Sequence, residues 1–298
     1  MSSLLVDVFL AQPISTVPPA PLPNNVPSLW TPTTSTLIHS AHEAILVDPL
    51  TTKIQSKELA DWVADTIPGK KLKYIYVTHG HGDHFFGIPG ILEKFPSALP
   101  IATKGVLKHM NEQITEGWPL WNTWFPGDQL EKPDLSKVQT LDDGHQKGEF
   151  PTIRIDDHIL HSVPVGHSDT NDTTVLWSPE LNLVVAGDAV YNGAFQYIVE
   201  STTVDQRNHW IQAVEKIKAL RPTSVVTGHK RPNAIDGAWT LDWTQQYLRS
   251  WDETTRMVKK EGGSAEVMFQ KMRQLYPDNV GNLILWISSL AEFPPPAK

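Results

Sequence analysis

Four apolar runs in this chain each end in a histidine or an aspartate, and this repeated pattern is the strongest constraint on its fold. The runs are rich in β-branched and aromatic residues, which predicts strands. They cover residues 72–77, 159–165, 181–186 and 223–227, and they lead into His79, His167, Asp188 and His229. In sheets flanked by helices, binding sites form outside the strand ends. We therefore expect an α/β protein in which these side chains meet at one edge.

The first strand end carries a dense cluster of metal-binding side chains. His79, His81, Asp83 and His84 form the pattern H-x-H-x-D-H in a loop just past the strand. Side chains two positions apart on an extended chain point the same way, so His79 and His81 can converge on one point. The two intervening glycines allow a turn that brings Asp83 and His84 to a second point. Histidines also cluster by chance, but imidazole and carboxylate at this spacing favour zinc or a similar divalent metal.

The composition narrows the kinds of site and partner. The chain has no cysteine, which excludes disulfides, thiolate nucleophiles and cysteine-based zinc sites, so any metal is held by histidine and carboxylate. With 25 basic and 33 acidic residues the net charge is −8, and the basic residues form only short pairs. Nucleic acid is therefore not an expected partner, because phosphate binding requires a clustered basic surface.

The chain is expected to fold as one domain over residues 1–298. A proline-rich passage at about 13–32 predicts an extended surface loop, because only about 12 residues precede it, too few for a separate domain. Residues 4–11 predict a first strand and neither a signal peptide nor a membrane span, so we expect a cytoplasmic protein with no membrane partner. The segment at about 238–290 predicts C-terminal helices, with Ser264 as a candidate N-cap.

Other segments complete the α/β pattern. Residues 36–39 and 43–49 predict two paired strands, and residues 56–67 and 205–220 predict helices from their apolar spacing. Asp48 ends the second of those strands, where it either forms a turn before proline or supports the site. Residues 118–126 predict a proline-bounded loop whose tryptophans either fill the core or line a pocket.

The order of the histidines and aspartates resembles the metallo-β-lactamase superfamily over essentially the whole chain. This resemblance implies a four-layer αβ/βα sandwich of the metallo-β-lactamase type, with two sheets face to face and helices outside. It also implies two divalent metal ions, with zinc the expected metal. By the resemblance, one metal is held by His79, His81 and His167, the second by Asp83, His84 and His229, and Asp188 bridges them. Taken singly, a residue such as His167, Asp188 or His229 is more often structural than a metal ligand.

The same resemblance implies a hydrolytic reaction. Two metals about 3.5–4 Å apart can share a hydroxide that attacks a carbonyl. Zinc β-lactamases usually carry Cys or Ser where this chain has Asp188, and an aspartate there is similar to glyoxalase II thioesterases and N-acyl-homoserine lactonases. Tyr191, three residues later, resembles a lactonase tyrosine that stabilises the oxyanion or leaving group, although it equally fits a packed position. The predicted function is opening of a lactone or lactam, with Asp83 and Tyr191 as catalytic residues.

Aromatic residues near the motifs suggest an apolar or aromatic small-molecule substrate. The candidate substrate-binding residues are Phe85, Phe86, Trp118, Trp121, Trp124, Tyr191 and Phe195. Asp169 and Asp172 follow His167 closely and are candidates to accept hydrogen bonds from imidazole N–H groups, although turn roles explain them equally well.

Two alternatives remain open. A glyoxalase II-like thioesterase acting on an acyl thioester would use the same metals and differ in the pocket. A non-hydrolytic metal-binding or redox protein would hold iron in the site and turn over no acyl substrate. The sequence does not indicate the oligomeric state.

Overall fold

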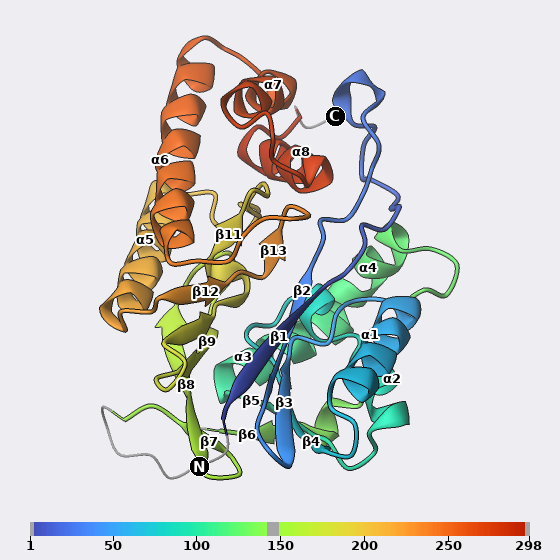
Figure 1. Cartoon of the computed structure of the whole chain (residues 1–298). Coiled ribbons are helices and arrows are strands. Elements are labelled where there is room, and N and C mark those ends of the chain that lie inside the picture. The colour runs from blue at the N-terminus through green and yellow to red at the C-terminus, as the bar shows by residue number, and fades with distance from the viewer. Residues whose placement is uncertain (1–2, 142–148, 296–298) are drawn as a thin grey trace.

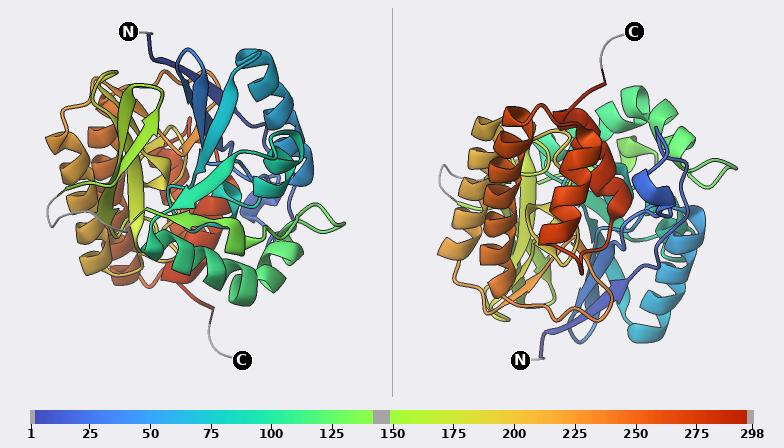
Figure 2. Two further views of the ribbon diagram at one scale, coloured as in Figure 1. Left: turned by 90° about the horizontal axis from the view of Figure 1, so that it is seen from below. Right: turned by 90° about the horizontal axis from the view of Figure 1, so that it is seen from above.

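Two β-sheets with helices against their outer faces form the molecule, as the computed structural model of residues 3–141 and 149–295 shows (Figures 1 and 2). The first sheet has the strand order β1-β2-β3-β4-β5-β6. Its strands are β1 (Leu5–Leu10), β2 (Thr34–His39), β3 (Glu43–Val47), β4 (Lys71–Tyr76), β5 (Leu99–Ala102) and β6 (Gln139–Thr140). The second sheet has the order β12-β10-β9-β8-β7. Its strands are β7 (Thr152–Ile155), β8 (His158–Gly166), β9 (Thr173–Ser178), β10 (Leu183–Val185) and β12 (Ser224–Val226).

The first sheet changes from antiparallel to parallel pairing at β3. The predicted pairing of residues 36–39 with 43–49 is confirmed, with β2 antiparallel to β3 and Ile38 opposite Ile45. From β3 to β6 the strands are parallel, so each connection crosses the sheet, and helices supply most of these crossings. The helices of this half are α1 (Lys53–Thr66), α2 (Ile88–Lys94), α3 (Lys104–Glu112) and α4 (Trp118–Trp124). Helix α1 begins earlier than its apolar spacing predicted, because Thr52 and Gln55 form a capping box there.

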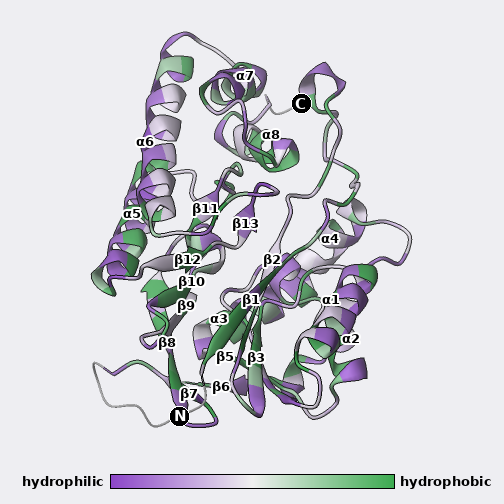
Figure 3. Ribbon diagram, viewed as in Figure 1, coloured by the Kyte–Doolittle hydropathy of each residue, from purple (hydrophilic) through white to green (hydrophobic). Residues whose placement is uncertain are grey.

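Alternating side chains on the strands build two separate cores. Ile38, Ile45 and Val47 belong to a cluster between the sheets, which also contains Leu160, Leu176 and Val185 of the second sheet. Their neighbours Leu37, Ala44 and Leu46 belong to a larger cluster with the helices. Because both faces of the sheets are buried, the strands are largely coloured hydrophobic in Figure 3. The predicted four-layer αβ/βα sandwich is confirmed.

Helices of the second half cover the other sheet and one end of the molecule (Figure 1). They are α5 (Val204–Ala219), α6 (Trp239–Lys260), α7 (Ala265–Leu275) and α8 (Asn282–Glu292). The buried guanidinium of Arg207 on α5 joins three of them, because it donates to Asp252 of α6 and to Glu292 of α8. The predicted C-terminal helices are confirmed. Ser264 occupies the N-cap position of α7, but its side chain makes no capping hydrogen bond.

The sequence prediction was wrong for the tryptophan-rich segment, which is helix α4 and not a loop. Pro119 stands in the first turn of this helix, where its missing N–H leaves no hydrogen bond unmade. The proline-rich segment before β2 has little regular structure, and it pairs with itself through Ser15 and Leu29. In the second half of the chain, β11 (Tyr191–Asn192) and β13 (His229–Lys230) form a short parallel pair near α6. Within residues 3–141 and 149–295, no helix combines the length and the apolar character needed to cross a bilayer.

Candidate metal centre and its pocket

The predicted strand ends of β4, β10 and β12 meet at one edge of the two sheets. The loop after β4 carries His79 to His84, the turn after β10 carries Asp188, and β13 begins with His229 after β12. Close approach of these ends depends on glycine. A Cβ atom at Gly228 would lie 2.0 Å from Asp188 Oδ1, and one at Gly187, whose φ is +50°, would lie 2.4 Å from Thr78 Oγ1.

A first cluster of possible metal ligands consists of His79, His81 and Asp169, all fully or nearly fully buried. Asp169 Oδ2 lies 2.7 Å from His81 Nδ1 and 3.5 Å from His79 Nε2. The two imidazoles lie close together as the H-x-H spacing predicted, although the chain bends at residues 78–80 instead of continuing as an extended strand. Their rings stand nearly perpendicular, at 87°, so one nitrogen of each can face the same point.

A second cluster consists of Asp83, His84 and His229. Asp83 Oδ2 lies 3.2 Å from His229 Nε2 and 3.7 Å from His84 Nε2. Asp188 joins this cluster with both oxygens, since Oδ1 lies 3.1 Å from His84 Nε2 and Oδ2 lies 3.2 Å from His229 Nε2. The turn after β4 and the C-terminal strand ends therefore bring side chains from both halves of the chain together.

His167 is the one predicted ligand that the structure places outside both clusters. Its Nδ1 lies 2.9 Å from Asn171 Oδ1 and its Nε2 lies 2.8 Å from Ser201 Oγ. Gly166 has a φ of +96°, and the turn it makes leaves His167 half-buried while Asp169 enters the interior. Asp169, predicted only as a partner for imidazole N–H groups, thus stands where His167 was expected. Asp172 is exposed in the turn, with a φ of +57°.

Each of the four histidines in the clusters has its second ring nitrogen held by a hydrogen bond. His84 Nδ1 donates to Asp48 Oδ2 at 2.9 Å, and His79 Nδ1 donates to Thr78 Oγ1 at 2.9 Å. Thr78 in turn donates to Asp48 from both its N–H and its hydroxyl. Asp48 therefore supports the site as well as turning the chain, with a φ of +57°.

The other two histidines are held from elsewhere in the chain. His81 Nε2 donates to Glu200 Oε1 at 3.0 Å, and His229 Nδ1 donates to the Pro32 carbonyl at 3.2 Å. The proline-rich segment also supplies Trp30, whose indole Nε1 donates to Asp83 Oδ2 at 3.0 Å. Such partners fix the orientation of a ligand and raise its basicity. The sequence analysis did not identify Glu200 or Trp30.

Several buried imidazole nitrogens and carboxylate oxygens of the two clusters are atoms of the kinds that bind a divalent metal. Four buried atoms, His79 Nε2, His84 Nε2, Asp169 Oδ2 and Asp188 Oδ1, make no regular hydrogen bond and have only the histidines and aspartates of the clusters as polar neighbours. An unpartnered buried imidazole or carboxylate is costly unless another group completes it. Imidazole nitrogen and carboxylate oxygen are ligands of zinc and related ions, so this donor set fits a metal centre.

Comparison with known proteins identifies the family. The family model described as the metallo-beta-lactamase superfamily matches residues 29–229, from the loop that carries Trp30 to His229 itself. The chain belongs to the metallo-β-lactamase superfamily. The protein is accordingly a metal-dependent hydrolase with a histidine and aspartate cluster, from a superfamily that uses divalent metals, typically zinc.

Similar proteins include several metallo-β-lactamases. The metallo-beta-lactamase type 2 of Bacteroides fragilis is 24% identical over 227 residues, which are 75% of this chain and 78% of that protein. The metallo-beta-lactamase from Pontibacter korlensis has a TM-score of 0.55 at 16% identity, covering 82% of this chain and 99% of that one. The metallo-beta-lactamase FIM-1 from Pseudomonas aeruginosa, in its mono-zinc form, has a TM-score of 0.54 at 16% identity, covering 83% and 91%. At these identities the structural likeness establishes the superfamily fold.

Charges in this superfamily site are set by the pairing of histidines with aspartates. Burial would lower the pKa of His229, but the neighbouring Asp188 carboxylate raises that pKa to about 9. Burial would raise the pKa of Asp188, but His229 and His84 hold that pKa well below its usual range. His79 differs, because burial dominates and lowers its pKa to about 4. Asp188 is therefore ionised and able to act as a ligand. The metal-free His229 ring is protonated on both nitrogens, and a metal must displace one of these protons.

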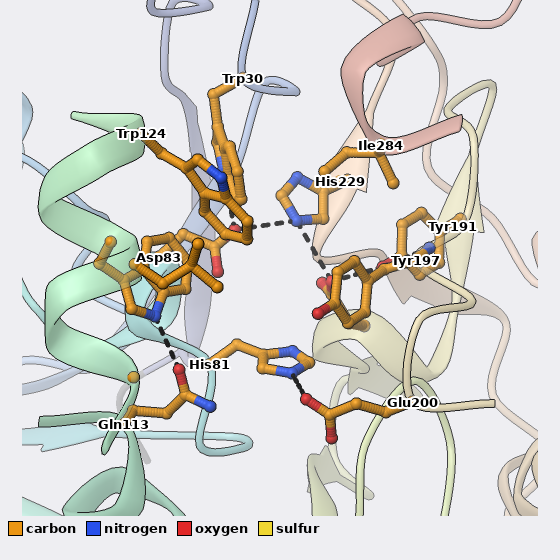
Figure 4. A pocket seen from close by; sticks show the side chains of 14 residues that line it. Trp30, His81, Asp83, Gln113, Trp124, Tyr191, Tyr197, Glu200, His229 and Ile284 are labelled. Carbon is orange, nitrogen blue, oxygen red and sulfur yellow. Dashed lines mark hydrogen bonds and ion pairs between the residues drawn. The ribbon is translucent and has the colours of Figure 1, made fainter. Parts of the chain in front are cut away.

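A cavity of about 150 Å³ opens directly over the second cluster (Figure 4). The metal-site residues in its wall are His81, Asp83, Asp188 and His229. The remaining wall is formed by Trp30, Gln113, Gly117, Leu120, Trp121, Trp124, Tyr191, Tyr197, Glu200 and Ile284. Tyr191 donates its phenol proton to Asp188 Oδ2 at 2.6 Å. Burial, followed by the charge of Asp188, raises the pKa of Tyr191 well above its usual value, so the phenol stays protonated.

Three of the seven predicted substrate-binding residues, Trp121, Trp124 and Tyr191, line this cavity, and four do not. Phe85 and Phe86 are fully buried in the core, where the ring of Phe86 packs against Trp118 and Trp121. Trp118 lies behind the cavity wall, and Phe195 packs against Tyr247 under α6. Phe85 and Phe86 follow the 3₁₀ turn of Gly82–His84 directly, and this turn points their rings into the core and away from the cavity.

Proposed function

We propose that this protein opens a cyclic ester or amide, a lactone or lactam, bound in the aromatic cavity above Asp83, Asp188 and His229. One observation carries the proposal. Asp188 lies within 3.2 Å of both His84 and His229 and accepts the phenol proton of Tyr191, which itself lines the cavity. By their resemblance to the lactonases, an aspartate at this position and a cavity-facing tyrosine after it favour lactone or lactam chemistry.

We further propose that the two clusters hold two zinc ions, with Asp188 between them. When bound, such ions polarise a carbonyl and activate water at neutral pH. In this proposal the ligands are His79, His81 and Asp169 in the first cluster and Asp83, His84 and His229 in the second. The unpartnered atoms of His79, His84, Asp169 and Asp188 support it, because they come from both clusters.

Asp83 and Tyr191 are the proposed catalytic side chains. Asp83 is held through Oδ2 by the indole of Trp30, so its carboxylate is fixed where it can orient water or accept a proton. Tyr191 keeps its proton on the phenol oxygen and presents it at the cavity wall. When the ring opens, this O–H can donate to the developing oxyanion or to the leaving oxygen or nitrogen.

The size and walls of the cavity support a compact ring substrate. A cavity of about 150 Å³ takes a group of roughly the size of one benzene ring when its walls are apolar. Trp30, Trp121 and Trp124 present aromatic faces to it, and stacking on such faces favours flat, apolar or aromatic molecules. The β-lactamase activity in the names of the relatives is a property of those proteins. This chain contains no cysteine, so it lacks the residue that zinc β-lactamases often carry where Asp188 stands.

The proposal is tested by loading the purified protein with zinc and measuring hydrolysis of matched lactones, lactams and thioesters. Elemental analysis of the same sample gives the metal content. We expect ring opening of lactones or lactams, and we expect His79→Ala and Asp188→Ala each to lose metal and at least about a hundredfold in kcat/KM. His209→Ala on α5 is the matched control, because this histidine is exposed. Turnover of thioesters alone would establish the thioesterase alternative, and no turnover of any acyl substrate would refute a hydrolytic role.

A further inference from the structure

We propose that Glu200 selects the charge of the bound molecule, so that the cavity accepts an uncharged or cationic ring compound and rejects one that bears a carboxylate. This inference depends on the proposed function only in identifying the bound molecule as a substrate. It begins with the composition of the cavity wall. Within the described part of the chain, no lysine or arginine lines the cavity. Apart from the histidines, every wall residue that carries a charge near neutral pH is a carboxylate.

Glu200 is the wall carboxylate that stands outside the proposed ligand set. Its oxygens are fixed, since Oε1 accepts from His81 Nε2 at 3.0 Å and Oε2 accepts from Thr170 Oγ1 at 2.6 Å. The backbone is held as well, because the Glu200 carbonyl accepts from Gln206 Nε2 at 3.0 Å. The side chain is 32% exposed and lines the cavity beside His81 (Figure 4), and each carboxylate oxygen has a second lone pair besides the one it uses.

Holding His81 does not by itself require a full negative charge. His229 is held in the same way by a neutral backbone carbonyl, that of Pro32. Glu200 adds a charge to the cavity wall, and that charge has a consequence for any molecule bound there. Two divalent ions would carry four positive charges, and the five carboxylates of Asp48, Asp83, Asp169, Asp188 and Glu200 would more than balance them. An anionic substituent therefore finds no net positive charge and no lysine or arginine partner in this wall.

Neutral ring compounds meet a different surface in the same cavity. Trp121, Trp124 and Tyr197 offer aromatic faces, and the free lone pairs of Glu200 can accept a hydrogen bond from an N–H or O–H group. A carboxylate brought to the same place meets like-charge repulsion from Glu200 in a partly dehydrated site. The selected class is therefore an uncharged or cationic ring compound, and a hydrogen-bond donor on it improves binding.

The test compares two single-ring probes of the same shape, a pyridone carboxamide and the matching pyridone carboxylate. Both are stable aromatic lactams, so calorimetry of the zinc-loaded protein measures binding without turnover. We expect the carboxamide to bind about tenfold more tightly than the carboxylate. Glu200→Gln should narrow this ratio to about twofold, because the glutamine can still accept from His81 but has lost the charge.

Glu112→Gln is the matched control. It removes the same charge from exposed helix α3, where the residue does not line the cavity, and it should leave the tenfold ratio unchanged. A pyridone with an aminomethyl group, tested on the unaltered protein, should bind at least as tightly as the carboxamide. This measurement keeps the inference testable if Glu200→Gln does not fold.

Several outcomes would overturn the inference. They are equal binding of the two probes by the unaltered protein, preference for the carboxylate, equal narrowing by both variants, or no binding of either neutral or cationic probe. Failure of the proposed function is recognised separately. In that case no lactone or lactam is hydrolysed, while the charge preference in binding is still present.

Discussion

Trp30 and Asp83 are joined by a buried hydrogen bond of 3.0 Å from the indole Nε1 to the carboxylate Oδ2. The contact links the proline-rich N-terminal segment to the H-x-H-x-D-H loop across 53 positions. It also makes one residue serve two purposes, because the same indole forms part of the cavity wall.

Replacing Trp30 by Phe keeps an aromatic wall and removes the donor to Asp83. We expect metal affinity to fall by about tenfold or more, as it does when the hydrogen-bond partner of a metal ligand is lost. Competition with a chelator measures the change. Trp124→Phe is a well-matched control, since Trp124 lines the same cavity and its Nε1 has no hydrogen-bond partner. Equal losses in the two variants would show that the indole hydrogen bond is not what matters.

Asp169 and His167 provide a direct test of the first cluster. Asp169→Ala removes an oxygen that lies 2.7 Å from His81, so the metal bound per chain should fall clearly. His167→Gln should keep most of the metal, because His167 contacts Asn171 and Ser201 instead. Elemental analysis after dialysis distinguishes the two. Loss of metal from the His167 variant, with the Asp169 variant unaffected, would favour the ligand set inferred from sequence.

Tyr191→Phe removes the phenol that donates to Asp188 while leaving the ring stacked near His229. If the phenol assists ring opening, kcat should fall by about ten- to a hundredfold when the variant and the unaltered protein are compared at equal metal loading. Tyr197→Phe provides the comparison, because Tyr197 lines the same cavity and lies outside the proposed ligand set. A larger effect on KM than on kcat would assign Tyr191 to binding rather than to the chemical step.

Metal binding should release protons near neutral pH. The neighbouring Asp188 carboxylate overcomes the effect of burial and raises the pKa of His229 to about 9, so the metal-free ring is protonated at about pH 7. A metal binds only the neutral ring, so apparent affinity should rise with pH, and the part of this rise that comes from His229 should end above about pH 9. Calorimetry in buffers of different ionisation enthalpy measures the protons released. Binding enthalpies that are independent of the buffer would contradict this expectation.

Sequence spacing was sufficient to predict those site residues whose positions depend on their immediate neighbours in the chain. His79 and His81 stand two positions apart just past a strand, and Asp188 and His229 follow apolar strands, so the sequence already predicts that they converge. Asp169 could not be chosen over His167 in this way, because both follow the same strand and the turn at Gly166 decides which one enters the interior. The signal available in the sequence was an aspartate two positions after a histidine, which alone cannot rank the two.

Partners from remote loops could not be predicted. Trp30 lies in a segment without periodicity, and Glu200 follows β11 in a connection without regular structure, so only the packed structure brings them to Asp83 and His81. Aromatic density was misleading for the opposite reason. Phe85 and Phe86 sit beside the ligands in sequence, yet the short turn that presents Asp83 and His84 directs both rings into the core.

The hydrogen bond between His229 and Pro32 spans 197 positions, and the ligands themselves come from both sheets. Contacts that are so distant in sequence form only after most of the chain has become compact, because closing long loops costs entropy before the contact contributes stability. Neither half of the chain offers a complete set of ligands alone. We therefore expect complete capture of metal to come late in folding, so that its appearance during refolding would mark the time at which the two sheets dock.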